Sequence, residues 1–261
     1  MRYAILSDIH GNIKALDICL EKIQKMQVDA YIFCGDYITD VPHAHEVLER
    51  IREWEGKYTC YIIKGNREDY IIQFAQEQNG KHKNKINFSY TLEQLTKEDM
   101  EYISNMPDSI EITQNDIPIY VSHKRNEEAT FPIKIYGHRH VQERNTIDGV
   151  TYINPGSVGL PSDNFVGTEF AILDVGENNI TTIFKQITYN INEVIDEVQS
   201  TKLVYEKDKW GKLVIKGIMT GEDYAFACME KVLQIAKQQG ISEDNIPCEL
   251  IEEVQKSMGI E

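Results

Sequence analysis

Seven side chains with nitrogen or oxygen donors stand at or just after the ends of predicted strands, where they could converge on metal ions. They are Asp8, His10, Asp36, Asn66, His123, His138 and His140. Each has a simpler explanation when taken alone, since a Gly-Asp after a strand is usually a turn and a single histidine is usually packed or solvated. Metal ions need converging donors on rigid elements, and strand ends provide them. The set as a whole therefore predicts a metal site.

The elements expected to position these donors begin with alternating strands and helices. Apolar runs at 3–6, 30–34 and 58–63 alternate with helical patterns over 12–25 and 43–55. This alternation predicts parallel strands with helical crossovers. Such sheets bind ligands at the carboxyl ends of their strands, where Asp8, Asp36 and Asn66 stand.

Residues 68–106 are predicted to be helical, with a break at 79–81 and a capping box from Thr96 to Asp99. Short strands follow, and their turns are typical of antiparallel hairpins in a second sheet packed on the first. The predicted strands are 109–113, 117–122, 133–136, 150–153, 169–174 and 181–187.

The C-terminal part of the chain is rich in charged helical segments, predicted at 192–200, 221–239 and 244–256. The second of them has an apolar face and must pack on something. We therefore expect one domain over 1–190 and a helical extension over 191–261, which could cover that domain or, in a homo-oligomer, a second subunit.

Composition narrows the class of protein. The chain has 261 residues, of which 41% are hydrophobic and 26% charged, as in ordinary globular proteins. Its formal charge of −15 argues against non-specific binding to nucleic acid. The five cysteines are scattered with no C-x-x-C pair, so we expect reduced thiols. No signal peptide or membrane span is apparent, so we predict a cytoplasmic protein without a membrane partner.

The donor residues resemble the motifs of the calcineurin-like metallophosphoesterases. The pattern D-x-H, G-D, G-N-H-[DE], H and G-H-x-H is matched by Asp8-Ile9-His10, Gly35-Asp36, Gly65-Asn66-Arg67-Glu68, His123 and Gly137-His138-Arg139-His140. The turn at 154–159 and the opening at 8–12 are similar to those of the smaller bacterial phosphodiesterase-like branch.

This resemblance implies an α/β fold, a four-layer αββα sandwich of two mixed sheets flanked by helices, with two divalent metal ions at its edge. Asp8, His10 and His140 would hold one ion, Asn66, His123 and His138 the other, and Asp36 would bridge both. Such a mixed ligand set suits Mn²⁺, which we favour, or Fe²⁺, Ni²⁺ or Zn²⁺.

The implied activity is hydrolysis of a small phosphorylated substrate, either a phosphodiester or a nucleotide phosphoanhydride. Two metal ions about 3.5–4 Å apart can lower the pKa of a shared water and hold phosphate oxygens for in-line attack. They would also supply the positive potential that a chain of charge −15 lacks. We assign catalytic roles to Asp36, Asn66 and Arg67.

The sequence departs from the family pattern at Arg67, where the family has a histidine. A guanidinium cannot act as a general acid, but it can clamp a phosphate with paired hydrogen bonds. Three further residues are candidates for substrate contacts. His43 could instead be a solvated helix start, Lys124 a solvated loop cation and Asn12 a helix cap.

Two other functions remain open. A protein serine/threonine phosphatase would use the same metals but needs an open groove, and the segment 68–106 is expected to limit access. An interaction scaffold of the same fold would have lost metal ligands, whereas all seven positions are filled here.

Overall fold

The first sheet has the strand order β10-β9-β1-β2-β3 in the computed structural model, which describes residues 1–76, 86–177, 179–205, 209–242 and 245–260. The strands β1 (Arg2–Leu6), β2 (Ala30–Phe33) and β3 (Cys60–Ile62) run parallel, as predicted. The hairpin of β9 (Thr168–Val175) and β10 (Ile180–Ile187) lies antiparallel beside β1. The carboxyl ends of β1, β2 and β3 therefore meet at one edge.

The second sheet has the order β4-β5-β6-β8-β7 and is mixed. Two antiparallel pairs, β4 (Ser109–Gln114) with β5 (Ile117–Ser122) and β7 (Gln142–Ile147) with β8 (Val150–Pro155), enclose β6 (Ile133–Ile135), which is parallel to both β5 and β8.

One expectation for the second sheet was wrong, because β9 and β10 belong to the first sheet. The second sheet is mixed, since β6 pairs in parallel with both β5 and β8, and the sequence did not indicate which strands these would be. Strand patterns record which residues are buried but carry no information on the direction of the neighbouring strand. The strand β7 was missed because its sequence, QERNTI, is polar and mostly exposed.

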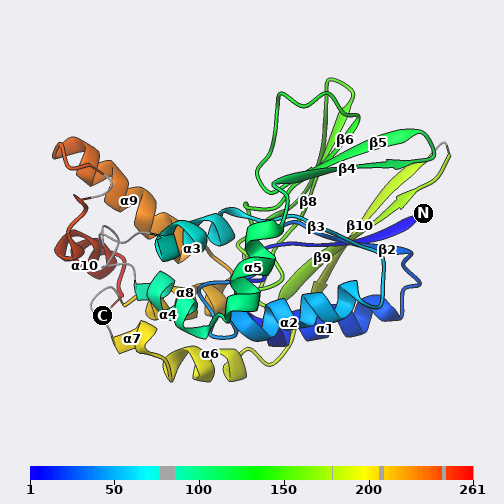
Figure 1. Ribbon diagram of the computed structural model, residues 1–261. Helices are drawn as coiled ribbons and strands as arrows, with labels where there is room; N and C mark the ends of the chain where they lie inside the picture. Colours follow the sequence, from blue (N-terminus) through cyan, green and yellow to red (C-terminus); the bar gives the residue numbers. More distant parts are fainter. Residues whose placement is uncertain (77–85, 178, 206–208, 243–244, 261) are drawn as a thin grey trace.

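The hydrophobic core has two layers, one on each face of the first sheet. On one face, Leu6 and Phe33 pack with the helices α1 (Ile13–Gln24) and α2 (Ala44–Glu55), which cover that face of the first sheet in Figure 1. Ile5 and Ile32, which alternate with them along the strands, pack against the second sheet. This arrangement confirms the predicted sandwich of two mixed sheets flanked by helices.

Along the chain, three helices lie between the strands β3 and β4. They are α3 (Asn66–Gln76), α4 (Ile86–Gln94) and α5 (Lys97–Asn105). The predicted capping box is confirmed: the Asp99 backbone N–H donates to Thr96 Oγ1, and the Thr96 backbone N–H donates to the Asp99 carboxylate. The predicted break at 79–81 lies outside the described residues.

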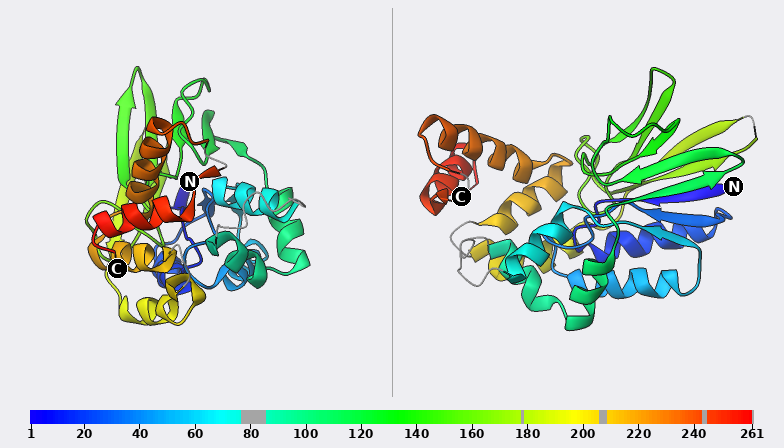
Figure 2. Two further views of the ribbon diagram at one scale, coloured as in Figure 1. Left: turned by 90° about the vertical axis from the view of Figure 1, so that its left-hand side faces the viewer. Right: turned by 45° about the horizontal axis from the view of Figure 1, so that its top comes forward.

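The C-terminal part forms α6 (Asn192–Gln199), α7 (Lys202–Tyr205), α8 (Trp210–Thr220), α9 (Tyr224–Gln238) and α10 (Cys248–Ser257). Their apolar faces form a third cluster that also includes Val41 and Leu160 of the sandwich. Figure 2 shows α9 and α10, in orange and red, at the end of the molecule opposite the N-terminus. No helix in the described part of the chain is long and apolar enough to cross a membrane.

The C-terminal helices thus contact the sandwich, while the domain division at residue 190 stays a prediction. The helices α7 and α8 were not expected from the sequence. The predicted helix at 221–239 begins later, at Tyr224, because Gly221 has φ +71° and closes α8, and the Asp223 side chain caps α9.

Candidate metal centre

All seven predicted donors lie together at the edge where the strands of both sheets end. Asp8 and His10 follow β1, Asp36 follows β2, and Asn66 follows β3 as the first residue of α3. From the second sheet, His123 follows β5, and His138 and His140 follow β6. The fold therefore brings residues that are more than 100 positions apart into one site.

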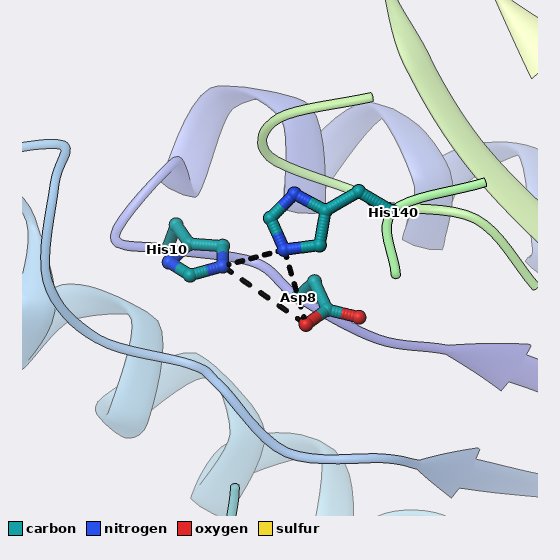
Figure 3. Close-up of side chains that lie close together, drawn as sticks. All are labelled: Asp8, His10 and His140. Atoms are coloured by element: carbon teal, nitrogen blue, oxygen red, sulfur yellow. Dashed lines mark hydrogen bonds and ion pairs between the residues drawn. The ribbon is translucent and has the colours of Figure 1, made fainter. Parts of the chain in front are cut away.

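Asp8, His10 and His140 form a first cluster, shown in Figure 3. The Nε2 atom of His140 lies 3.1 Å from Nε2 of His10 and 3.3 Å from Oδ1 of Asp8. All three residues are buried. One oxygen and two nitrogens thus point toward a common position.

Asp36, His123 and His138 form a second cluster, with Asn66 beside it. The Nε2 atom of His123 lies 3.0 Å from Oδ1 of Asn66 and 3.3 Å from Oδ2 of Asp36. His138 is exposed, whereas Asp36 and His123 are buried. This cluster therefore has an open side at His138.

The imidazoles are oriented by contacts on their other ring nitrogen. The Nδ1 atoms of His123 and His140 each lie 2.8 Å from a backbone carbonyl oxygen, that of Cys34 and that of Leu160. A carbonyl oxygen only accepts, so both Nδ1 atoms donate. This is the usual support of metal-binding histidines, because it turns Nε2 toward the metal. The donor set therefore fits divalent metal ions.

A third oriented imidazole revealed a residue that the sequence analysis missed. The Nδ1 atom of His10 lies 2.8 Å from Oδ2 of Asp40, a buried carboxylate. Although burial disfavours its charged form, Arg67 and His10 hold the pKa of Asp40 below its usual range. The only signal in the sequence was an aspartate four positions after Asp36.

Several of the donor residues adopt left-handed backbone conformations, which are uncommon for residues other than glycine. Asp8, His10, Asp36, His138 and His140 have φ between +51° and +69°. Such conformations cluster at functional sites because the surrounding structure must hold them in place. The backbone is thus shaped to turn these side chains inward.

The turn at 154–159, which resembled one branch of the family, supports the backbone of these loops. Asn154 Nδ2 donates to the Gly137 carbonyl at 2.7 Å, and Ser157 Oγ donates to the Asp8 carbonyl at 2.7 Å. Gly137 must be a glycine, because a Cβ atom there would lie 2.0 Å from Ser7 Oγ.

The charge balance of the site also favours a bound cation. Burial disfavours ionised carboxylates, yet His140 lowers the pKa of Asp8 and His123 lowers that of Asp36. In return, despite burial, Asp36 raises the pKa of His123 to about 10 and Asp8 raises that of His140 to about 9. The buried carboxylates thus attract positive charge, which divalent ions would supply.

Arg67 lies between two acidic groups of the site. Its Nη2 is 3.7 Å from Oδ2 of Asp40, its Nε is 4.0 Å from Oδ2 of Asp36, and its backbone N–H donates to Oδ1 of Asp36 at 2.8 Å. The side chain keeps 21% of its surface exposed. Arg67 is therefore placed beside both carboxylates, with part of its side chain accessible.

Two of the predicted substrate contacts are engaged elsewhere. The Asn12 amide group donates to the Gly159 carbonyl and to Tyr189 Oη, and its oxygen caps α1. These bonds use both amide hydrogens and argue against a phosphate contact. His43 lies 3.2 Å from Glu197 and 3.4 Å from Glu46, outside both clusters.

Lys124 remains next to the site. It is exposed and lines a groove of about 600 Å³ that also borders Asn66 and His123. Arg125, in the same groove, is paired with Glu127 at 2.7 Å.

Comparison with known proteins agrees with this architecture. Residues 1–178 match the calcineurin-like phosphoesterase superfamily domain. A phosphodiesterase of Methanocaldococcus jannaschii is 22% identical over 182 residues, covering 65% of this chain and 94% of that protein.

Two solved structures share the fold at 20% sequence identity. A hypothetical protein of Pyrococcus horikoshii has a TM-score of 0.70 and covers 84% of this chain and 98% of its own. A metallophosphoesterase from Sphaerobacter thermophilus has a TM-score of 0.65, and the match covers 85% of this chain and 100% of that protein. Since the matching domain spans more than half of the sequence and contains both clusters, the chain belongs to the calcineurin-like phosphoesterase superfamily.

Proposed function

We propose that this protein is a metal-dependent phosphohydrolase that cleaves a small phosphodiester or a nucleotide phosphoanhydride. The observation that carries the proposal is the position of Asp36 between the two clusters. Its Oδ2 atom lies 3.9 Å from Nε2 of His10 and 3.3 Å from Nε2 of His123. One carboxylate oxygen that faces both clusters is suited to bridge two metal ions.

In this proposal Asp8, His10 and His140 hold one ion, Asn66, His123 and His138 hold the other, and Asp36 contacts both. Divalent ions, with Mn²⁺ favoured over Fe²⁺, Ni²⁺ and Zn²⁺, would supply an activated water and neutralise phosphate charge. The chain itself fixes the imidazoles and supplies Arg67, a cation beside both carboxylates that can bind a phosphate oxygen.

The groove beside the second cluster supports a small substrate. Its volume of about 600 Å³ lies within the range of small-molecule sites, and Lys124 offers a positive charge in it. The phosphodiesterase of Methanocaldococcus jannaschii, which resembles this chain at 22% identity, supports a diester as the first candidate.

Substrate class can be tested by product release, with Mn²⁺ added, from bis-p-nitrophenyl phosphate, p-nitrophenyl phosphate and a dinucleoside polyphosphate. We expect cleavage of the diester or the anhydride and little cleavage of the monoester. A marked preference for the monoester would contradict this choice. Failure to cleave any of the three while metals are bound would point to a protein phosphatase or a scaffold.

A further inference from the structure

One contact joins the C-terminal extension (residues 191–261) to the proposed metal site. Trp210, the first residue of α8, donates its indole N–H to Oδ1 of Asp40 at 2.6 Å. The other oxygen of the same carboxylate, Oδ2, lies 2.8 Å from Nδ1 of His10. Both Trp210 and Asp40 are buried, so water does not compete well for these hydrogen bonds.

The turn that carries Asp40 needs outside support. Thr39 and Asp40 have φ of +80° and +68°, and this region is unfavourable for a β-branched residue such as threonine. The next residue, Val41, is 2% exposed and packs in the apolar cluster formed mainly by the C-terminal helices. The extension therefore holds two successive residues of this turn, Asp40 by a hydrogen bond and Val41 by packing.

The orientation of His10 depends on this turn. His10 has a left-handed backbone, with φ of +51°, and its Nδ1 contacts Asp40 together with Thr39 Oγ1 at 3.4 Å. A carboxylate that accepts from Nδ1–H fixes the neutral imidazole in the tautomer whose lone pair is on Nε2, the atom that faces Asp8 and His140. Thr39 Oγ1 and Arg67 Nη2 approach Oδ2 of Asp40, whereas Trp210 donates to Oδ1. Loss of the Trp210 donor would therefore leave Oδ1 less restrained and loosen His10.

We propose that Trp210 is a positioning residue for the first metal site and acts through Asp40 on His10. This inference rests on the proposed function, and it gives the C-terminal extension a role in binding the ion held by Asp8, His10 and His140. Trp210 lies beyond residues 1–178, which match the family domain, so this support comes from outside that domain. In the second cluster, Nδ1 of His123 is held by the backbone carbonyl of Cys34, which lies outside the C-terminal extension.

Trp210→Phe keeps an aromatic ring in place but removes the indole N–H. Binding of Mn²⁺ to the full chain is measured by equilibrium dialysis. We expect one of the two ions to bind about tenfold more weakly, at the low end of the range for groups that support metal ligands, and the other to bind as in the wild type. Equal affinities of variant and wild type for both ions, or equal losses at both sites, would overturn the inference.

The chain offers a matched control in its second tryptophan. Trp54 is 8% exposed, as Trp210 is, and packs against Tyr31 and Tyr58 in the sandwich. Trp54→Phe should bind both ions as the wild type does. It also leaves Trp210 as the sole tryptophan, whose fluorescence should change as Mn²⁺ fills the first site. Unchanged Trp210 emission at full metal loading would contradict the inference. This test needs no substitution of Trp210 itself.

Asp40→Asn provides a second test should Trp210→Phe fail to fold. The amide has a similar shape but no charge to orient His10, so we expect about 10–100-fold weaker binding of one ion. If the wild type binds no metal, both the proposed function and the inference fail. If the wild type binds two ions and these variants bind both equally well, only the inference fails.

Discussion

Oδ2 of Asp36 lies 3.3 Å from Nε2 of His123 and 3.9 Å from Nε2 of His10, so one carboxylate faces histidines that come from different sheets. Oδ1 of Asp36 accepts a hydrogen bond from the Arg67 backbone N–H at 2.8 Å. The side chain is thus fixed on one oxygen and open to both clusters on the other.

Asp36→Asn should abolish turnover, with a loss of at least about 100-fold, because a neutral amide cannot balance the charge of two cations. Metal content should fall as well. Product release from bis-p-nitrophenyl phosphate and metal analysis of the purified variant check both expectations. An active variant with full metal content would contradict the bridging role.

Arg67→Ala should raise KM by about tenfold, the loss expected for one charge-assisted hydrogen bond to a phosphate. The acidic limb of the pH profile should stay in place, since a guanidinium does not titrate in this range. Steady-state kinetics from about pH 5 to about pH 9 measures both. A displaced acidic limb would mean that Arg67 acts by tuning a neighbouring acid.

Gly137→Ala should disturb the site through packing alone. The new Cβ atom would lie 2.0 Å from Ser7 Oγ and 2.8 Å from Asp8 Oδ2, so Ser7 and Asp8 must move. We expect a loss of roughly 1–3 kcal/mol in the free energy of unfolding, together with weaker metal binding. Urea unfolding and Mn²⁺ dialysis measure the two effects.

Gly56→Ala is the matched control for this substitution. Gly56 follows α2 with φ −69°, and a Cβ atom there would have no neighbour closer than 3.6 Å. Its free energy of unfolding and its metal binding should stay close to those of the wild type. If both glycine variants behaved alike, close approach at Gly137 would not explain the result.

Glu169→Gln tests a buried acid that supports the turn at 154–159. Burial raises the pKa of Glu169 to about 8, with a contribution from Asp163. A raised pKa means that the folded state holds the proton more tightly. The stabilisation is therefore complete below the unfolded pKa of about 4.5 and is lost as the pH rises through about 8.

The wild type should accordingly lose stability relative to Glu169→Gln between about pH 5 and about pH 8.5, by on the order of 3 kcal/mol. Urea unfolding of both proteins at the two pH values measures this double difference, in which the titration of shared groups cancels. A constant difference would show that Glu169 keeps its ordinary pKa in the fold.

The sequence predicted two mixed sheets and predicted that the seven donors lie together, but it did not predict which strands pair in each sheet. His138 and His140 could be placed because strand ends and glycines mark them locally. The parallel pairing of β6 with both neighbours could not be predicted, since the residue pattern of a strand does not indicate which strand lies beside it. Asn12 illustrates a different limit: its type suits a phosphate contact or a cap, and only its hydrogen bonds to Gly159 and Tyr189 favour the cap.

The groups that support the metal site were the hardest to foresee. Asp40 had only a weak signal, and Trp210 had none, because 170 residues separate it from its partner. Contacts of this kind depend on how the helices pack, which no local pattern encodes.

The central claim is that two metal ions bind at these clusters and that hydrolysis depends on them. The most direct measurement is the number of Mn²⁺ ions bound per chain, by equilibrium dialysis and elemental analysis, in the same samples whose cleavage of bis-p-nitrophenyl phosphate is followed. We predict that two ions bind per chain and that activity is lost with a chelator and returns with Mn²⁺. One ion or none in a fully active sample would contradict the account.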